Sequence, residues 1–305
     1  MVSTRVIRAV ALLAVAWSVC GYATPPDEKE ERFERAYCVK CHSTQVRAIE
    51  RTPHGNPDDA RTPFANEQCE SCHGDTSVHL EFSKAEEADF GEMLTFKTKD
   101  RSKAAKRNNA CLQCHQGGER IHWQGGAHDT NDIACIDCHK IHDRDHAINK
   151  ETQASVCFTC HKNVKIDFLR PYAHPSNEKI SCSDCHKHHG SAGPKELKRF
   201  DINEVCYDCH AEKRGPFLWE HPPASEECVS CHRPHGSNHF ALLKSRPPFL
   251  CQQCHQNQRG PRHVRQAMEY TDTPGRSRFI VGSACMNCHS KVHGSNHPSG
   301  FSLKR

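Results

Sequence analysis

Twenty of the chain's 21 cysteines form ten copies of the pattern Cys-x-x-Cys-His, a spacing typical of covalent haem attachment. On one helical turn, positions i and i+3 face the same side, so both cysteines of a motif can form thioethers to one porphyrin. The histidine that follows then lies beneath the iron. We therefore expect ten haems c, attached by Cys38, Cys41, Cys69, Cys72, Cys111, Cys114, Cys135, Cys138, Cys157, Cys160, Cys182, Cys185, Cys206, Cys209, Cys228, Cys231, Cys251, Cys254, Cys285 and Cys288.

The ten motif histidines are the expected proximal ligands of the haem irons. Zinc ribbons and disulfide frameworks also use paired cysteines, but neither explains a histidine directly after every second cysteine. The tenfold repetition also argues against chance. The proximal set is His42, His73, His115, His139, His161, His186, His210, His232, His255 and His289.

Fifteen of the 25 histidines lie outside the motifs and can fill the opposite, distal axial positions. Around each pair of motifs, one histidine lies between the two motifs and another follows the second. This grouping predicts five two-haem modules, at about residues 38–79, 111–142, 157–189, 206–235 and 251–293. The second to fifth modules begin 46, 49 and 45 residues apart, which indicates an internal repeat. The predicted distal ligands are His54, His79, His128, His142, His174, His189, His221, His235, His263 and His293.

A histidine three residues after its own motif histidine, such as His189 after His186, can hardly bind the same iron, because the porphyrin separates the two axial sides. We expect such a histidine to reach a neighbouring haem and so hold successive haems close together. Which distal histidine serves which haem stays open at this point. The five histidines left over are interpreted as surface or propionate-binding side chains, although any of them can replace a chosen ligand: His122, His146, His188, His239 and His297.

The first 23 residues have the features of a secretory signal peptide. Arg5 and Arg8 precede an apolar run over residues 9–19, and small residues at 21 and 23 suit cleavage before Thr24. The alternative is a lipoprotein in which Cys20 is acylated, but Val19 is a poor residue before such a cysteine. No later stretch is apolar enough to cross a bilayer. We therefore expect an exported decahaem domain over residues 24–305.

The mature chain offers only about 28 residues for each haem, too few for an ordinary hydrophobic core. We expect an elongated multihaem c-type cytochrome of loops and short α-helices, with little or no β-sheet and with the haems forming the core. The formal net charge is +4, but about twenty haem propionates would make the loaded protein net acidic. Nucleic-acid binding is therefore not expected.

Bis-histidine ligation leaves no open iron position for a substrate, which favours electron transfer over catalysis. Only Met93, Met268 and Met286 follow the predicted signal as competing axial ligands, and Met286 lies inside a motif. A multihaem nitrite or hydroxylamine enzyme is the alternative, and it would need one haem with an open position. We expect no dedicated catalytic site, with direct Fe(II) oxidation at an exposed haem as the open exception.

The motif number, the paired arrangement and the closing segment CMNCHSKVHGSNHPSG at 285–300 resemble the MtrA/MtoA/PioA and DmsE family of periplasmic decahaem cytochromes. The resemblance covers essentially the whole mature chain. It implies a row of haems inserted into an outer-membrane β-barrel porin, as a conduit between periplasm and cell exterior. The implied partners are that porin, a periplasmic or inner-membrane cytochrome, and an outer-surface cytochrome or extracellular iron.

The direction of electron flow stays open, because haem chains conduct according to the potentials at their ends. Family members reduce Fe(III), oxidise Fe(II) or feed an extracellular dimethyl sulfoxide reductase, and an iron-linked role is the preferred interpretation. A second hypothesis is a soluble periplasmic electron shuttle that needs no barrel. Firm association with the outer membrane through a porin would distinguish the two.

Overall fold

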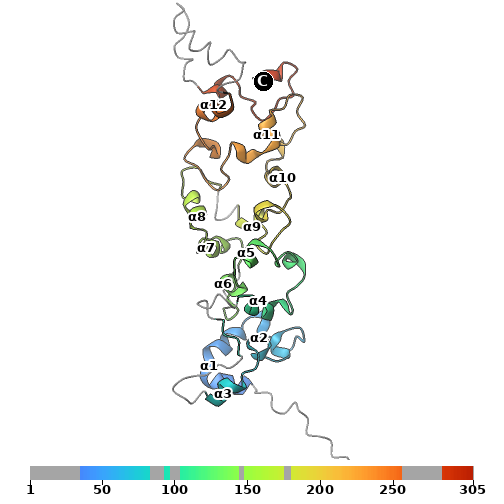
Figure 1. Ribbon diagram of the computed structural model, residues 1–305, viewed down its shortest axis with the longest axis vertical. Helices are drawn as coiled ribbons and strands as arrows, with labels where there is room; N and C mark the ends of the chain where they lie inside the picture. Colours follow the sequence, from blue (N-terminus) through green and yellow to red (C-terminus); the bar gives the residue numbers. More distant parts are fainter. Residues whose placement is uncertain are drawn as a thin grey trace, which may run out of the picture.

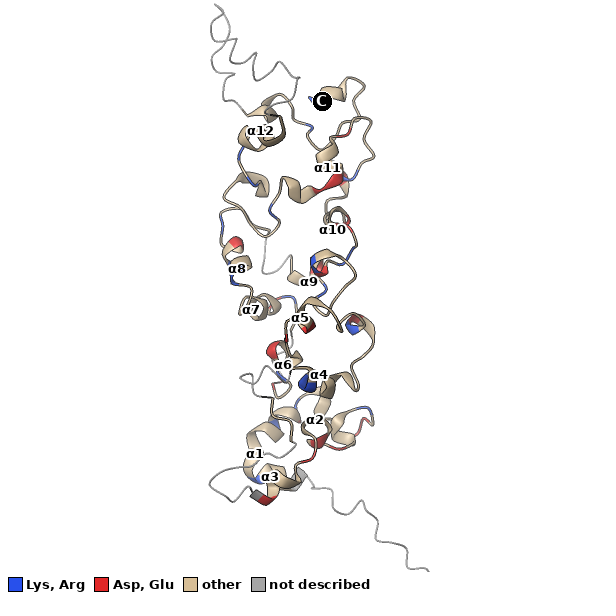
Figure 2. Ribbon diagram, viewed as in Figure 1, with Lys and Arg blue, Asp and Glu red and all other residues tan. Residues whose placement is uncertain are grey.

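The computed structural model describes residues 35–82, 93–96, 104–143, 148–174, 180–255 and 284–304. The predicted signal peptide and the predicted ligand His263 lie outside these residues, as does His146. The described chain forms one elongated column, which Figure 1 shows with the earliest helices at one end and the last motifs at the other. Lysine, arginine, aspartate and glutamate positions are scattered along this column rather than gathered at one end (Figure 2).

The secondary structure consists of short helices joined by loops, which confirms the fold class expected from the sequence. The α-helices are α1 (Arg35–Ile49), α2 (Glu70–His73), α3 (Ser77–Phe82), α4 (Ala104–Leu112), α5 (Ala127–Thr130), α6 (Cys135–Cys138), α7 (Gln153–Cys157), α8 (Lys162–Phe168), α9 (Cys182–Cys185), α10 (Ile202–Tyr207), α11 (Pro222–Glu226) and α12 (Phe249–His255). The 3₁₀ turns are η1 (Pro53–Gly55), η2 (Pro63–Ala65), η4 (Gly118–Arg120), η5 (Pro194–Glu196), η6 (Ala211–Lys213), η7 (Cys228–Ser230), η8 (Phe240–Leu242), η10 (Cys285–Asn287) and η11 (Gly300–Ser302). Within the described ranges, β-pairing is limited to isolated bridges such as Tyr172 with Ser237.

The protein core is small and scattered. Among the described residues, the buried hydrophobic side chains are Val46, Ile49, Phe64, Leu94, Ala104, Trp123, Ala134 and Val205. Large apolar side chains such as Leu169, Phe200 and Phe240 are 75 to 81% exposed. Polypeptide alone therefore buries little apolar surface, as expected for a chain whose cofactors supply much of the core.

Helical turns span the motifs, as their spacing predicts, and most of these turns are short. In α6 and α9, for example, the backbone N–H of the motif histidine donates to the carbonyl of the first cysteine, at 2.8 Å for His139 and 2.9 Å for His186. The motif aspartates stabilise these turns: Asp137 accepts from the N–H of Ala134, and Asp184 from that of Ser181, both at 2.8 Å. Such contacts satisfy a backbone donor that a helix start leaves open.

Buried amide side chains join the two motifs of a module. The Asn108 side chain in α4 donates to the Ile133 carbonyl at 3.1 Å and accepts from the Cys135 N–H at 2.8 Å, next to α6. Asn203 in α10 repeats this arrangement with Ser225 and Cys228, at 3.0 and 2.7 Å. Both asparagines are at most 3% exposed. Because both ends of each amide are bonded, it sets the distance between consecutive motifs.

Candidate haem-binding sites

Several of the predicted axial histidines are held by backbone carbonyls. A carbonyl oxygen only accepts, so the ring Nδ1 that faces it must carry the proton, and Nε2 is left free to bind a metal. Among motif histidines, Nδ1 lies 2.6 to 3.0 Å from a carbonyl in His73, His186, His232 and His289. The predicted distal histidines with such a contact are His128, His142, His174 and His221.

Nine motif histidines each lie opposite one predicted distal histidine. The ring centres are 5.9 to 6.4 Å apart in every pair. The pairs are His42 with His79, His73 with His142, His115 with His54, His139 with His189, His161 with His128, His186 with His235, His210 with His174, His232 with His293, and His255 with His221. The predicted partner of His289 is His263, which lies outside the described residues.

This spacing fits one metal ion between the two rings of each pair. An imidazole nitrogen binds a transition metal at roughly 2 Å, so two rings on opposite sides of one ion have centres roughly 6 Å apart. Rings in direct contact can lie closer, as the tilted rings of the neighbours His188 and His189 do at 4.4 Å. The paired residues can therefore supply both axial ligands of a haem iron.

The pairs follow one rule that ties each module to the next. In modules one to four, the histidine between the motifs faces the first motif histidine of the following module, as His128 faces His161. In modules two to five, the histidine after the second motif faces the second motif histidine of the preceding module, as His189 faces His139. At the start of the column, His79 faces His42 of its own module. The crossing inferred for His189 is thus present in the geometry.

The cysteines form a matching alternation along the column. Within each module the first cysteines of the two motifs lie close together. The neighbouring Cys69 thiol lowers the pKa of Cys38 to about 7, and the Cys38 thiol raises the pKa of Cys69. The same contact joins Cys111 to Cys135, Cys157 to Cys182, Cys206 to Cys228 and Cys251 to Cys285.

Between modules it is the second cysteines that are close. Burial, followed by the nearby second cysteine of the next module, raises the pKa of Cys72 and of Cys231. The neighbouring pairs are Cys72 with Cys114, Cys138 with Cys160, Cys185 with Cys209, and Cys231 with Cys254. Consecutive motifs are therefore adjacent in space from the first to the tenth.

Burial keeps several of the paired imidazoles in the neutral form that binds metal. It is the main cause that lowers the pKa of His189 to about 4, with the neighbouring His188 adding to the effect. Burial also lowers the pKa of His54, His73, His235 and His293. At neutral pH these side chains retain a free nitrogen lone pair.

Two buried donors next to one histidine pair fit the carboxylates of a haem. Trp123 is 7% exposed, and its ring centre lies 6.4 Å from that of His189. Its Nε1 and the Nε of Arg120 are buried without a hydrogen-bond partner among the described residues. A buried donor without a partner costs about 1–3 kcal/mol. A haem held by His139 and His189 would bring propionates that can accept from both.

Sequence reasoning missed the carbonyls that hold the imidazoles and the buried amides between motifs. A constant spacing was the one available signal. The carbonyls of Lys195 and Ala241 each contact the motif histidine that lies nine residues earlier in the chain. The contact between the Glu196 carboxylate and His128, at 3.4 Å, joins residues far apart in the sequence and had no local signal. The four described spare histidines, at positions 122, 188, 239 and 297, take no part in the nine pairs.

Comparison with known proteins identifies the family of this chain. Family models match the chain in three places: a doubled CXXCH motif at residues 174–215 and 221–260, a cytochrome c-type protein similar to NrfB at 69–150, and cytochrome c554 and c-prime at 22–74. Multiheme cytochrome MtrA of Shewanella baltica (strain OS185) is 42% identical over 276 residues, which cover 88% of this chain and 80% of the relative.

The chain belongs to the MtrA family of multihaem c-type cytochromes. The resemblance inferred from the motifs is thereby confirmed, together with haem c as the cofactor and electron transfer as the general activity of this MtrA homologue. The described helices include none that is both long and apolar enough to cross a membrane.

Proposed function

We propose that this MtrA homologue binds ten haems c and carries electrons along the whole column. Haem c supplies a one-electron Fe(III)/Fe(II) couple when bound. The observation that carries the proposal is the register of the nine histidine pairs, each joining one motif histidine to one predicted distal histidine. In this proposal His263 is the distal partner of His289, which completes the tenth site.

The paired histidines would hold each haem iron from both sides, which would leave no coordination site for a substrate. This supports an electron carrier without a dedicated catalytic centre. The crossing pairs also hold each module against the next, and the cysteines of consecutive motifs lie close together along the column. Together these side chains maintain an unbroken row of redox sites along the elongated column seen in Figure 1.

We place the mature protein in the periplasm, docked in an outer-membrane β-barrel porin. Its relationship to MtrA and the elongated shape of the column support this location. A periplasmic or inner-membrane cytochrome contacts one end of the row, and an outer-surface cytochrome or extracellular iron the other. Transfer is linked to Fe(II) oxidation or Fe(III) reduction. A soluble periplasmic shuttle and a feeder of an extracellular dimethyl sulfoxide reductase are the alternatives.

Purification of the tagged protein from outer membranes in mild detergent tests this location. A β-barrel protein recovered in equal amount supports the conduit, and an additional surface cytochrome favours electron flow out of the cell. Recovery only from the soluble periplasmic fraction, without a barrel, contradicts the conduit and leaves the shuttle.

A further inference from the structure

Three predicted distal histidines sit in repeated surroundings that can be compared position by position. His128, His174 and His221 each lie with Nδ1 at the backbone carbonyl of the residue two places before a glycine. For His128 this is the His188 carbonyl at 3.0 Å, and for His221 the Val292 carbonyl at 2.9 Å. The backbone contact is thus common to all three sites, so any difference between them must come from side chains.

Glu196 is the side chain that makes the His128 site different. Its Oε2 lies 3.4 Å from the His128 Nδ1, and its side chain is 13% exposed. Its Oε1 accepts from the Ala127 N–H at 2.7 Å, at the start of the short helix α5 that carries His128. One carboxylate therefore both fixes this helix start and places a negative charge beside the imidazole.

The other two modules have leucine at the matching position. The carbonyls of Glu196, Leu242 and Leu303 accept in the same way from a backbone N–H just after a motif histidine, at 2.7, 2.7 and 2.9 Å. All three residues have left-handed backbone conformations, with φ of 55, 59 and 56°. The three positions therefore share one backbone geometry, and of the three only Glu196 has a carboxylate.

Another carboxylate approaches a predicted ligand, but from a greater distance and from an exposed position. Glu212 Oε1 lies 3.9 Å from the His210 Nδ1, and its side chain is 63% exposed. Water and salt screen such an exposed charge strongly. The largely buried Glu196 is screened much less, so its effect on the neighbouring imidazole is the larger of the two.

We propose that Glu196 is a positioning residue that lowers the reduction potential of the haem held by His128 and His161. This inference rests on the proposed axial ligation of that haem. A negative charge beside a ligand imidazole raises the basicity of the ligand and favours the more positively charged Fe(III) state. The fifth of the ten haems then differs in potential from the seventh and ninth, although their backbone surroundings match.

The test is a redox titration of the full-length, haem-loaded protein followed by its visible absorbance, with Glu196→Leu and Glu196→Gln compared with wild type. We expect both variants to raise one potential out of ten, favouring Fe(II) at that site about tenfold, or about 59 mV for a one-electron couple. Glu196→Gln keeps an acceptor for the Ala127 N–H, so it separates loss of charge from loss of the helix contact. Ten unchanged potentials in Glu196→Gln would overturn the inference.

A carboxylate introduced at the matching leucine is the matched control, and its result does not depend on how the Glu196 variants fold. Leu242→Glu should place a carboxylate beside His174 and lower one other potential, favouring Fe(III) about tenfold; an unchanged potential counts against the inference. Ligation is checked separately with His128→Ala, which should leave one iron in ten high-spin. If His128→Ala stays fully low-spin, the proposed ligand pair itself is wrong. If His128→Ala shows one high-spin iron but the Glu196 variants leave all ten potentials unchanged, the ligand pair stands and only the role of Glu196 is rejected.

Discussion

Replacement of His189 by alanine tests the crossing between modules. The His189 ring lies 6.0 Å from the His139 ring and nearly parallel to it, at 18°, although His189 follows the motif that ends at His186. If His189 binds the iron above His139, its loss opens the fourth haem and leaves the sixth intact. One iron in ten becomes five-coordinate, so about one tenth of the ferric signal should change from low-spin to high-spin.

Carbon monoxide binding to the reduced protein measures this change. We expect one equivalent per chain in His189→Ala and none in wild type. His188→Ala is the matched control, because His188 is the adjacent histidine, its ring contacts that of His189 at 4.4 Å, and it takes no part in the nine pairs. It should bind no carbon monoxide.

Removal of single haems assigns the open iron. In a background without the fourth haem, made by replacing Cys135 and Cys138 with alanine, His189→Ala should no longer bind carbon monoxide. In a background without the sixth haem, made by replacing Cys182 and Cys185, binding should persist. The opposite pattern would show that His189 serves its own module and would refute the crossing.

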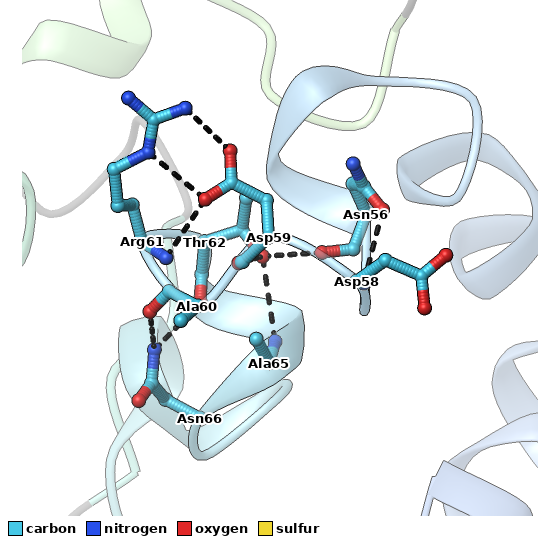
Figure 3. A network of polar contacts seen from close by, with 8 residues as sticks. All are labelled: Asn56, Asp58, Asp59, Ala60, Arg61, Thr62, Ala65 and Asn66. Atoms are coloured by element: carbon cyan, nitrogen blue, oxygen red, sulfur yellow. Dashed lines mark hydrogen bonds and ion pairs between the residues drawn. The ribbon is translucent and has the colours of Figure 1, made fainter.

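Two stability predictions follow from contacts outside the histidine pairs. Asn108→Ala breaks two hydrogen bonds and should lower the free energy of unfolding by about 2–4 kcal/mol. Asn109→Ala removes an exposed neighbouring side chain and should change that free energy little. Denaturant titration of both variants measures the difference. Asp59, hydrogen-bonded to the side chain and backbone N–H of Arg61 (Figure 3), has its pKa lowered to about 2. The ionised Asp59 stabilises the fold above the unfolded pKa of about 4, and this stabilisation is lost as the pH falls to about 2. Asp59→Asn should therefore flatten the dependence of the unfolding free energy on pH between these values. An unchanged dependence contradicts this prediction.

The sequence predicted what depends on local spacing. Cys157, Cys160 and His161 lie within five residues, so one helical turn is enough to bring them to one haem, and the turn is present. The short helices and the small core also followed from the few residues available per haem. The division into modules identified candidate partners, because His128 and His174 each lie between two motifs.

The register of the pairs could not be read from spacing alone. His142 is 69 residues from His73, and the contact depends on how two modules stack. The same is true of Asn108, whose amide reaches the Cys135 backbone 27 residues away, and of Glu196, which reaches the Ala127 backbone across 69 residues. A single polar residue in a short helix or turn carries no sequence signal for a tertiary contact of this kind. Only the stacked geometry distinguishes Glu196 from a solvent-exposed carboxylate.

The proposed haem chain is a continuous row of ten irons, each bound by two histidines. Spin quantitation of the fully oxidised, full-length protein by electron paramagnetic resonance tests it most directly, because bis-histidine haems are low-spin and an open site is high-spin. We expect ten low-spin ferric ions per chain and no high-spin signal. A high-spin iron in the wild-type protein, or fewer than ten irons, would contradict it and would reopen a catalytic role for the haem concerned.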